Sequence, residues 1–290
     1  MDGPIDRRKI LWSLLAVIAA IAALTGAVDR FSGDLAEQAL KRALVTFAVS
    51  RTLNGVISVA QGTEVAVEPG GVGVTMGVGQ ILDPINDLVE RFSGVMLIAA
   101  SSIGLQILLL NIAGSWMVTG LFVAAAVGAL AALWIRGLAR SRYGPLLLRV
   151  FLVMFFLRFA VPLLTIGTNT VFDLFLEPQQ AAATEALRAT QSEIEELEEA
   201  TREPNDEDQS WMDRIGSAID ESLKAMNVTE RLDQLKQTAS EASEHIVVLI
   251  AVFVLETILL PLALLWLLIE LLKTVASRAM AFKPGGKGGA

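Results

Sequence analysis

Three kinds of chemistry are excluded by what this 290-residue chain lacks. It has no cysteine, which excludes disulfides, thiol catalysis and cysteine-ligated metals. Histidine occurs once, at His245, so a site with two or three imidazole ligands cannot form within one chain. A hydrolase needs a nucleophile, a base and a group that orients the base, and no such set or metal motif is present. We therefore expect no enzymatic activity, no cofactor and no bound metal.

Charge is scarce outside one segment, and its distribution indicates a membrane protein with a hydrophilic insert. The chain is 53% hydrophobic with a mean hydropathy of +0.57, and several charge-free runs approach the length of a bilayer crossing. Residues 177–244 carry 18 acidic and 6 basic side chains, which leaves a net charge of +4 on the rest of the chain. Nucleic acid is not an expected partner, because phosphate contacts need clustered Lys and Arg and the large hydrophilic segment is acidic. The lipid bilayer is the first partner that the composition predicts.

A long stretch without a charged side chain covers residues 94–135. A hydrocarbon core of about 30 Å needs roughly 20 apolar helical residues, so this run is too long for one crossing and just long enough for two. If it crosses once, the basic residues Arg7–Lys9, Arg136–Arg142 and the lysines of the tail all lie on one side, as the positive-inside rule prefers. We therefore expect one crossing here, with 84–113 packed on its neighbours at or above the outer leaflet. A double crossing is the alternative.

Four crossings are then predicted, with both termini in the cytoplasm of a bacterial cell and the protein in its inner membrane. The first crossing follows a basic flank and has Trp12 near its start, where an interfacial indole is expected. Its alternative interpretation is a cleaved signal peptide that ends at the small residues Thr25-Gly26-Ala27. The predicted crossings are residues 10–28, 117–135, 145–175 and 246–272.

The segment between the first two crossings has helical, then alternating, then helical patterning. Residues 34–61 place apolar side chains at helical spacing, and Asp83-Pro84 is a favourable start for a second helix. Between them, valines alternate on both sides of Glu68-Pro69-Gly70-Gly71, which predicts a β-hairpin within 62–79. The glycines do not have the GxGxxG spacing of a nucleotide loop, and no helix opens directly from them.

The acidic segment 177–244 has apolar residues three and four apart on both sides of a break at Pro204-Asn205-Asp206. This spacing predicts an extracytoplasmic helical hairpin of coiled-coil type with Glu-rich outer faces. The acidic run Glu193–Glu199 is interpreted as a solvated helix face, because carboxylates on the outside of a helix do not converge as the ligands of a calcium loop do.

Charged residues inside the predicted crossings are the best candidates for a functional site. A charge at bilayer depth costs several kcal/mol, so it usually pairs or faces water. Arg158 and Glu256 match in depth on the antiparallel third and fourth crossings, and Arg149 and Glu270 match near the inner face. Two buried ion pairs that lock the helices are predicted. A polar path for ions or protons and snorkelling without pairing are the alternatives.

The single imidazole has two interpretations. His245 lies at the predicted outer boundary of the fourth crossing, where a polar residue caps the entry into the membrane. It is also the side chain that can change charge near neutral pH, which makes it a candidate pH sensor.

The predicted fold is an all-α integral membrane protein with an extramembrane helix–hairpin–helix region and an acidic coiled-coil-like hairpin. The expected function is a non-enzymatic scaffold or assembly protein that forms a homo-oligomer or binds a membrane partner. The alternative is a small oligomeric channel or transporter with Arg158 and Glu256 beside the path. The predicted segments of the chain are 1–29, 30–113, 114–176, 177–244 and 245–290.

Overall fold

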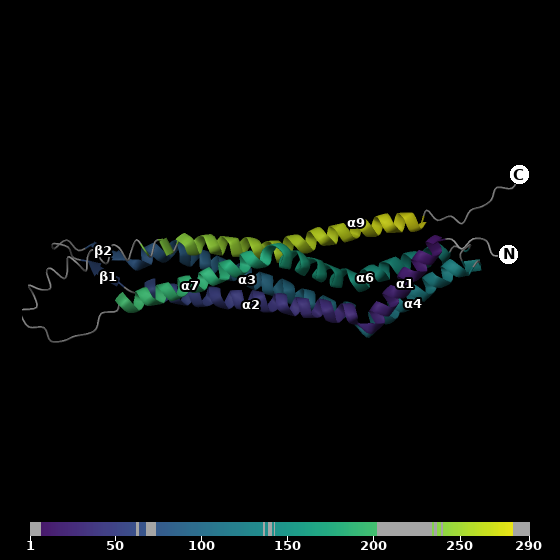
Figure 1. Cartoon of the computed structure of the whole chain (residues 1–290), viewed down its shortest axis with the longest axis horizontal. Helices are drawn as coiled ribbons and strands as arrows, with labels where there is room; N and C mark the ends of the chain where they lie inside the picture. The colour runs from purple at the N-terminus through teal and green to yellow at the C-terminus, as the bar shows by residue number, and fades with distance from the viewer. Residues whose placement is uncertain are drawn as a thin grey trace, which may run out of the picture. The chain divides into compact units, whose positions relative to one another are not determined.

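The computed structural model describes residues 7–61, 64–67, 74–135, 137–138, 141, 143–201, 234, 237–238 and 240–280 (Figure 1). Long helices dominate it, and the chain divides into two compact units. The first unit contains residues 1–41, 101–173 and 255–290, and the second contains 42–100 and 174–254. The helices are α1 (Arg7–Thr25), α2 (Ala27–Gln61), α3 (Val78–Ala113), α4 (Trp116–Trp134), α6 (Tyr143–Val171), α7 (Glu177–Thr201) and α9 (Leu260–Met280), with π-helical turns η2 (Phe172–Leu176) and η3 (Leu255–Leu259).

Among the described residues, four helices are long and apolar enough to cross a membrane, which supports the expectation of a transmembrane protein. They are Asp83–Ala113, Trp116–Trp134, Tyr143–Glu196 and Ser240–Ser277. Three of them contain predicted crossings, whereas the fourth, 83–113, is the helix that the sequence analysis put beside the bilayer. The predicted first crossing belongs to a bent pair, in which Lys9–Thr25 and Ala27–Val59 meet at 58°. Counting that bent pair as one span would raise the number to five.

Several boundaries differ from the prediction because neighbouring elements continue one another. α3 begins at Val78, so Pro84 lies inside the helix rather than at its first position. α6 runs through η2 into α7 without an interruption, so the helix that holds the third predicted crossing extends to Thr201. Pro162 lies inside α6 and does not end it.

Two short strands lie between α2 and α3. β1 (Glu64–Val67) pairs antiparallel with β2 (Val74–Gly77), so that Glu64 is opposite Gly77 and Val67 is opposite Val74. The Glu68–Gly71 turn lies outside the described residues, so the hairpin as a whole stays a prediction. The same holds for the turn at Pro204 and for the helical hairpin of 177–244, of which α7 is the main described part.

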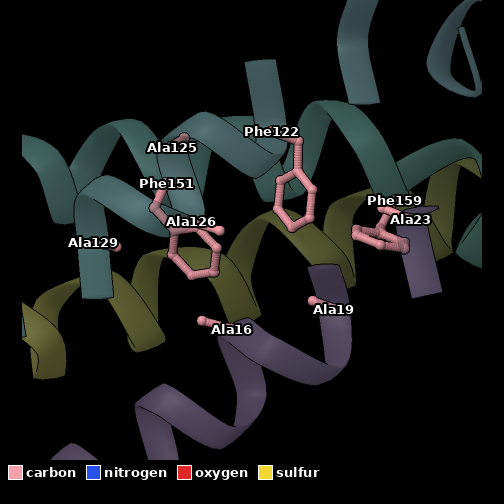
Figure 2. Packing of buried hydrophobic residues seen from close by; sticks show 9 residues of the cluster. All are labelled: Ala16, Ala19, Ala23, Phe122, Ala125, Ala126, Ala129, Phe151 and Phe159. Atoms are coloured by element: carbon pink, nitrogen blue, oxygen red, sulfur yellow. The ribbon is translucent and has the colours of Figure 1, made fainter. Parts of the chain in front are cut away.

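The first unit is held together by phenylalanine rings and a strip of alanines. Phe122 of α4 stacks on Phe151 of α6 with ring centroids 5.8 Å apart and meets Phe159 edge-on at 5.4 Å. In Figure 2 these rings lie beside α1, whose buried face consists of small residues. Small side chains allow two helices to approach closely, which is how helices associate in a membrane. The alanines of the cluster are Ala16, Ala19, Ala23, Ala125, Ala126 and Ala129.

The second unit consists of amphipathic helices. One set of its apolar side chains is buried, while charged ones such as Asp87 and Arg91, which form an ion pair, are exposed. Two buried polar contacts cross between helices: the Oγ atoms of Ser50 and Ser93 are 3.0 Å apart, and Gln180 donates to Thr46 over 3.4 Å. The largest buried apolar residues are Leu53, Ile57, Ile85, Phe92, Met96, Leu187, Ile194 and Phe253.

Candidate functional site

The candidate site begins at the break between α1 and α2. Gly26 has φ +63°, a left-handed conformation that side chains with a Cβ rarely adopt. The two carbonyls at the break are satisfied by Arg30, whose backbone N–H donates to Gly26 and whose guanidinium donates to Thr25 at 3.2 Å. The break therefore ends the apolar helix α1 and places Asp29 in the first turn of α2.

A second break, between α3 and α4, meets the first one. Ser115 caps α4, and its hydroxyl accepts a hydrogen bond from the backbone N–H of Val118 at 3.4 Å. The preceding Gly114 lies against Asp29: a Cβ at Gly114 would be 3.4 Å from Cγ of Asp29. Glycine at this position leaves room for the carboxylate, so Asp29 lies where both helix breaks come together.

Arg158 of α6 binds this carboxylate with two hydrogen bonds. Its Nη1 donates to Oδ1 of Asp29 at 2.7 Å and its Nη2 donates to Oδ2 at 2.5 Å, the bidentate geometry that makes Arg–carboxylate pairs strong. Nη2 also donates to the carbonyl of Ala23 at 3.4 Å, and the guanidinium lies 5.3 Å from the ring centre of Phe159. The Arg158 side chain is 1% exposed and that of Asp29 is 23% exposed. The charge of Arg158 is thus compensated by a partner that keeps some access to solvent.

The pair lies at one end of two helices of bilayer length. α1 and α4 each have 19 residues, which corresponds to about 28 Å, close to the thickness of a hydrocarbon core. At the other end the indole of Trp134 donates to the hydroxyl of Ser13 at 2.9 Å. The helices α1 and α4 therefore run antiparallel, with Ser13–Trp134 at one end and Asp29–Gly114 at the other.

The acidic partner of Arg158 differs from the predicted one, Glu256. Gly167 of α6 lies against Leu264 of α9, and the two helices run in opposite directions (Figure 1). This register offsets Arg158 and Glu256 by about 17 residues, or roughly 25 Å along the helix axis at 1.5 Å per residue. Glu256 is itself buried, 3% exposed, in the π-helical turn η3. The prediction compared the depths of Arg158 and Glu256 below the outer ends of their helices. It was wrong because it assumed that these two ends lie at the same level.

The other predicted charges and the histidine lie apart from the pair. Arg149 and Glu270 are both exposed, and Glu270 accepts a hydrogen bond from Lys273, three residues along α9, at 3.2 Å. The local partner Lys273 was not considered by the sequence analysis. His245 is half-buried in the second unit, on the helix that leads into η3. Its role as a pH sensor stays a prediction.

Asp29 is the residue that the sequence analysis missed. It follows the first predicted crossing, at the last position of the segment 1–29, and was not compared with Arg158 because the comparison covered only helices joined by the acidic insert. A signal was present in the sequence: an acid three residues after a glycine that ends an apolar run can accept hydrogen bonds from a buried Arg. Within the described ranges no three His, Asp or Glu side chains converge as a metal site would require.

No protein-family model, curated protein or solved structure matches this chain.

Proposed function

We propose that this chain is a non-enzymatic integral membrane scaffold that assembles with further copies of itself. The observation that carries this proposal is how Arg158, the most deeply buried charged side chain among the described residues, is bound. Arg158 is held by contacts with Asp29, Ala23 and Phe159, which connect α6 to the helix breaks at Gly26 and Gly114. A guanidinium bound in this way holds helices together and is not free to bind a substrate.

The proposed topology has α1, α4, α6 and α9 as the four crossings. Exposed indoles at both ends of α4 support it: Trp116 is 84% exposed and Trp134 is 56% exposed, and they are about 27 Å apart along the helix. Indoles at such a spacing are typical of the two interfaces of a bilayer. In this topology the Arg158–Asp29 pair lies near the outer interface. Both termini and Arg136–Arg142 are then cytoplasmic, in a bacterial inner membrane, and the segments 30–113 and 177–244 are extracytoplasmic.

The spacing of buried residues along α2 and α7 supports an assembly role. Buried residues along α2 are separated alternately by four and three positions, which is the spacing of the inner positions of a coiled coil. The same spacing recurs from Leu176 of η2 to Ile194 of α7. Helices with this spacing are typical of coiled coils, which associate along long helix faces. The buried α2 residues that follow this spacing are Ser32, Ala36, Ala39, Ala43, Thr46, Ser50, Leu53 and Ile57.

The proposal is tested by measuring oligomeric state and ion conductance of the full chain in lipid nanodiscs and planar bilayers. Native mass spectrometry of nanodiscs is expected to give assemblies of two or more copies, without single-channel conductance. A monomer at all protein-to-lipid ratios would overturn the assembly role. Conductance that charge reversal at Glu256 abolishes would favour the channel alternative instead.

A further inference from the structure

The break between α1 and α2 has the sequence features of a processing site as well as those of a helix break. The basic residues Arg7–Lys9 come before the apolar run of α1, and the small residues Thr25-Gly26-Ala27 follow it, as at the end of a secretory signal peptide. A signal peptidase that recognised these residues would hydrolyse the peptide bond between Ala27 and Val28. Hydrolysis consumes one water molecule and leaves a carboxylate on Ala27 and a new amino terminus on Val28.

Burial does not protect this bond. Thr25 and Ala27 are exposed and Gly26 is half-buried, so a protease can reach the chain on both sides of Gly26. In the proposed topology the break also lies near the outer interface, on the side of the membrane to which a signal peptide directs a chain. Whether the bond is cut therefore depends on the conformation and the hydrogen bonds of the backbone.

The conformation of the break differs from the one that a protease binds. Proteases bind their substrates as extended strands, through main-chain N–H and C=O groups. Gly26 instead has φ +63°, and Ala27 and Val28 lie in the first turn of α2. Two nearby carbonyls are occupied as well: that of Thr25 accepts from the guanidinium of Arg30, and that of Gly26 accepts from the backbone N–H of Arg30. The bond is therefore held in a form that a protease cannot bind.

One guanidinium holds the chain on both sides of the bond. Nη2 of Arg158 donates to the carbonyl of Ala23 at 3.4 Å and to Oδ2 of Asp29 at 2.5 Å. These two oxygens are therefore at most about 6 Å apart, whereas the chain from Ala23 to Asp29 would span about 20 Å if it were extended. The short side chain of Asp29 makes up only a small part of this difference. The segment cannot become extended while Arg158 holds both of its ends.

We propose that the Arg158–Asp29 pair prevents a signal peptidase from cutting the Ala27–Val28 bond, so that α1 stays attached to the chain as a membrane anchor. The pair thus protects a latent processing site in addition to holding helices together. The cut would remove α1 and with it the alanine face that packs beside the ring of Phe122. The proposal rests on the proposed topology only for the side of the membrane on which the break lies.

Purified bacterial signal peptidase, added to the full chain in detergent, tests this protection directly. The Arg158→Gln variant should release a product that begins at Val28, identified by its intact mass. Wild-type protein should be cut at least about tenfold more slowly, because cleavage after local opening follows the population of the open form. Arg158 is far from the bond in the sequence, so this variant leaves unchanged the residues that the peptidase recognises.

Three further variants separate the effect of the pair from that of stability in general. Arg158→Lys keeps the charge without the bidentate geometry and should be cut at an intermediate rate. Leu53→Ala removes a fully buried side chain of α2 well beyond the break and should be cut no faster than the wild type. Arg158→Gln combined with Ala27→Leu should give no product that begins at Val28, because a signal peptidase requires a small residue before the cut. Circular dichroism reports whether each variant is folded.

Equal rates of cutting in wild-type and Arg158→Gln protein would overturn the proposal, and so would a folded Arg158→Gln variant that stays uncut. If Arg158→Gln does not fold, the same comparison is made with Arg158→Lys. An equal acceleration by Leu53→Ala would show that general unfolding exposes the bond, which overturns the proposal too. The same variants expressed in bacterial cells test the topology separately. A product that forms in detergent but not in cells would put the break on the cytoplasmic side, which overturns the proposed topology and leaves the protection by Arg158 intact.

Discussion

Gly167 of α6 lies so close to α9 that a Cβ on it would be 3.0 Å from Cδ1 of Leu264. This contact sets the register of the two helices. It therefore determines which residues of α9 lie level with the charged residues of α6.

Gly167→Ala should destabilise the protein or leave its stability unchanged. Ala is favoured over Gly in a helix by about 1 kcal/mol, but overpacking against Leu264 costs about 1–3 kcal/mol. Gly120 of α4 is the matched control, since nothing lies within 4 Å of a Cβ built on it, so Gly120→Ala should stabilise by about 0.5–1 kcal/mol. Thermal unfolding in detergent measures both variants. An equal gain in stability in the two variants would contradict the close contact at Gly167.

The two partners of the buried ion pair should respond unequally to neutralisation. Asp29→Asn leaves the fully buried Arg158 without a carboxylate and should lower the free energy of unfolding by about 3–5 kcal/mol. Arg158→Gln leaves Asp29, which has some access to water, and should cost less, about 1–3 kcal/mol.

The double variant measures the coupling of this pair. Asp29→Asn with Arg158→Gln should recover part of the loss, because neither charge is left alone. Glu256→Gln serves as a control and should combine additively with Arg158→Gln. Coupling to Glu256 in place of Asp29 would contradict the register described above.

The loss of stability on replacing Ser50 or Ser93 should depend on which of the two hydroxyls donates the hydrogen bond. Ser50 has one hydroxyl hydrogen and donates it to the carbonyl of Phe47 at 2.8 Å, so Ser93 is the donor between the two. Ser50→Ala leaves the buried Ser93 hydroxyl without its acceptor and should cost about 1–3 kcal/mol.

The paired replacement tests this assignment. Ser50→Ala with Ser93→Ala should be less destabilising than Ser50→Ala alone, since no buried donor is then left without an acceptor. Urea unfolding monitored by circular dichroism gives the free energies of unfolding of the two single variants and the double variant. A double variant that loses as much as the sum of the single ones would show that the hydroxyls do not interact.

The proposed topology makes a prediction about thiol labelling in intact cells. Cysteine at Glu195, an exposed residue of α7, should react with a membrane-impermeant reagent, because α7 lies outside in this arrangement. Cysteine at Lys273, an exposed residue of α9, should react only after permeabilisation. The opposite pattern at both positions would invert the topology, and labelling of both in intact cells would require a different number of crossings.

The apolar helices could be predicted from the sequence because their signal is local. Charge-free runs and three- and four-residue spacings appear within a single window, and residues 117–134, 145–175 and 246–272 of the predicted crossings are helical in the structure. The first and last residues of the helices were harder to predict. Pro84 looks like a helix start, yet α3 begins at Val78, since a tertiary environment can hold a helix turn that proline disfavours locally.

The partner of Arg158 could not be predicted in the same way. The sequence by itself determines that an Arg buried in an apolar helix needs an acid, because a buried guanidinium without compensation is too costly. Which acid supplies it was decided by the tertiary structure. Asp29 is 129 residues away, and it reaches Arg158 because Gly26 takes a positive φ and Gly114 leaves room for the carboxylate. Backbone conformation at a break and register between helices arise from packing across the whole bundle, which no local pattern records.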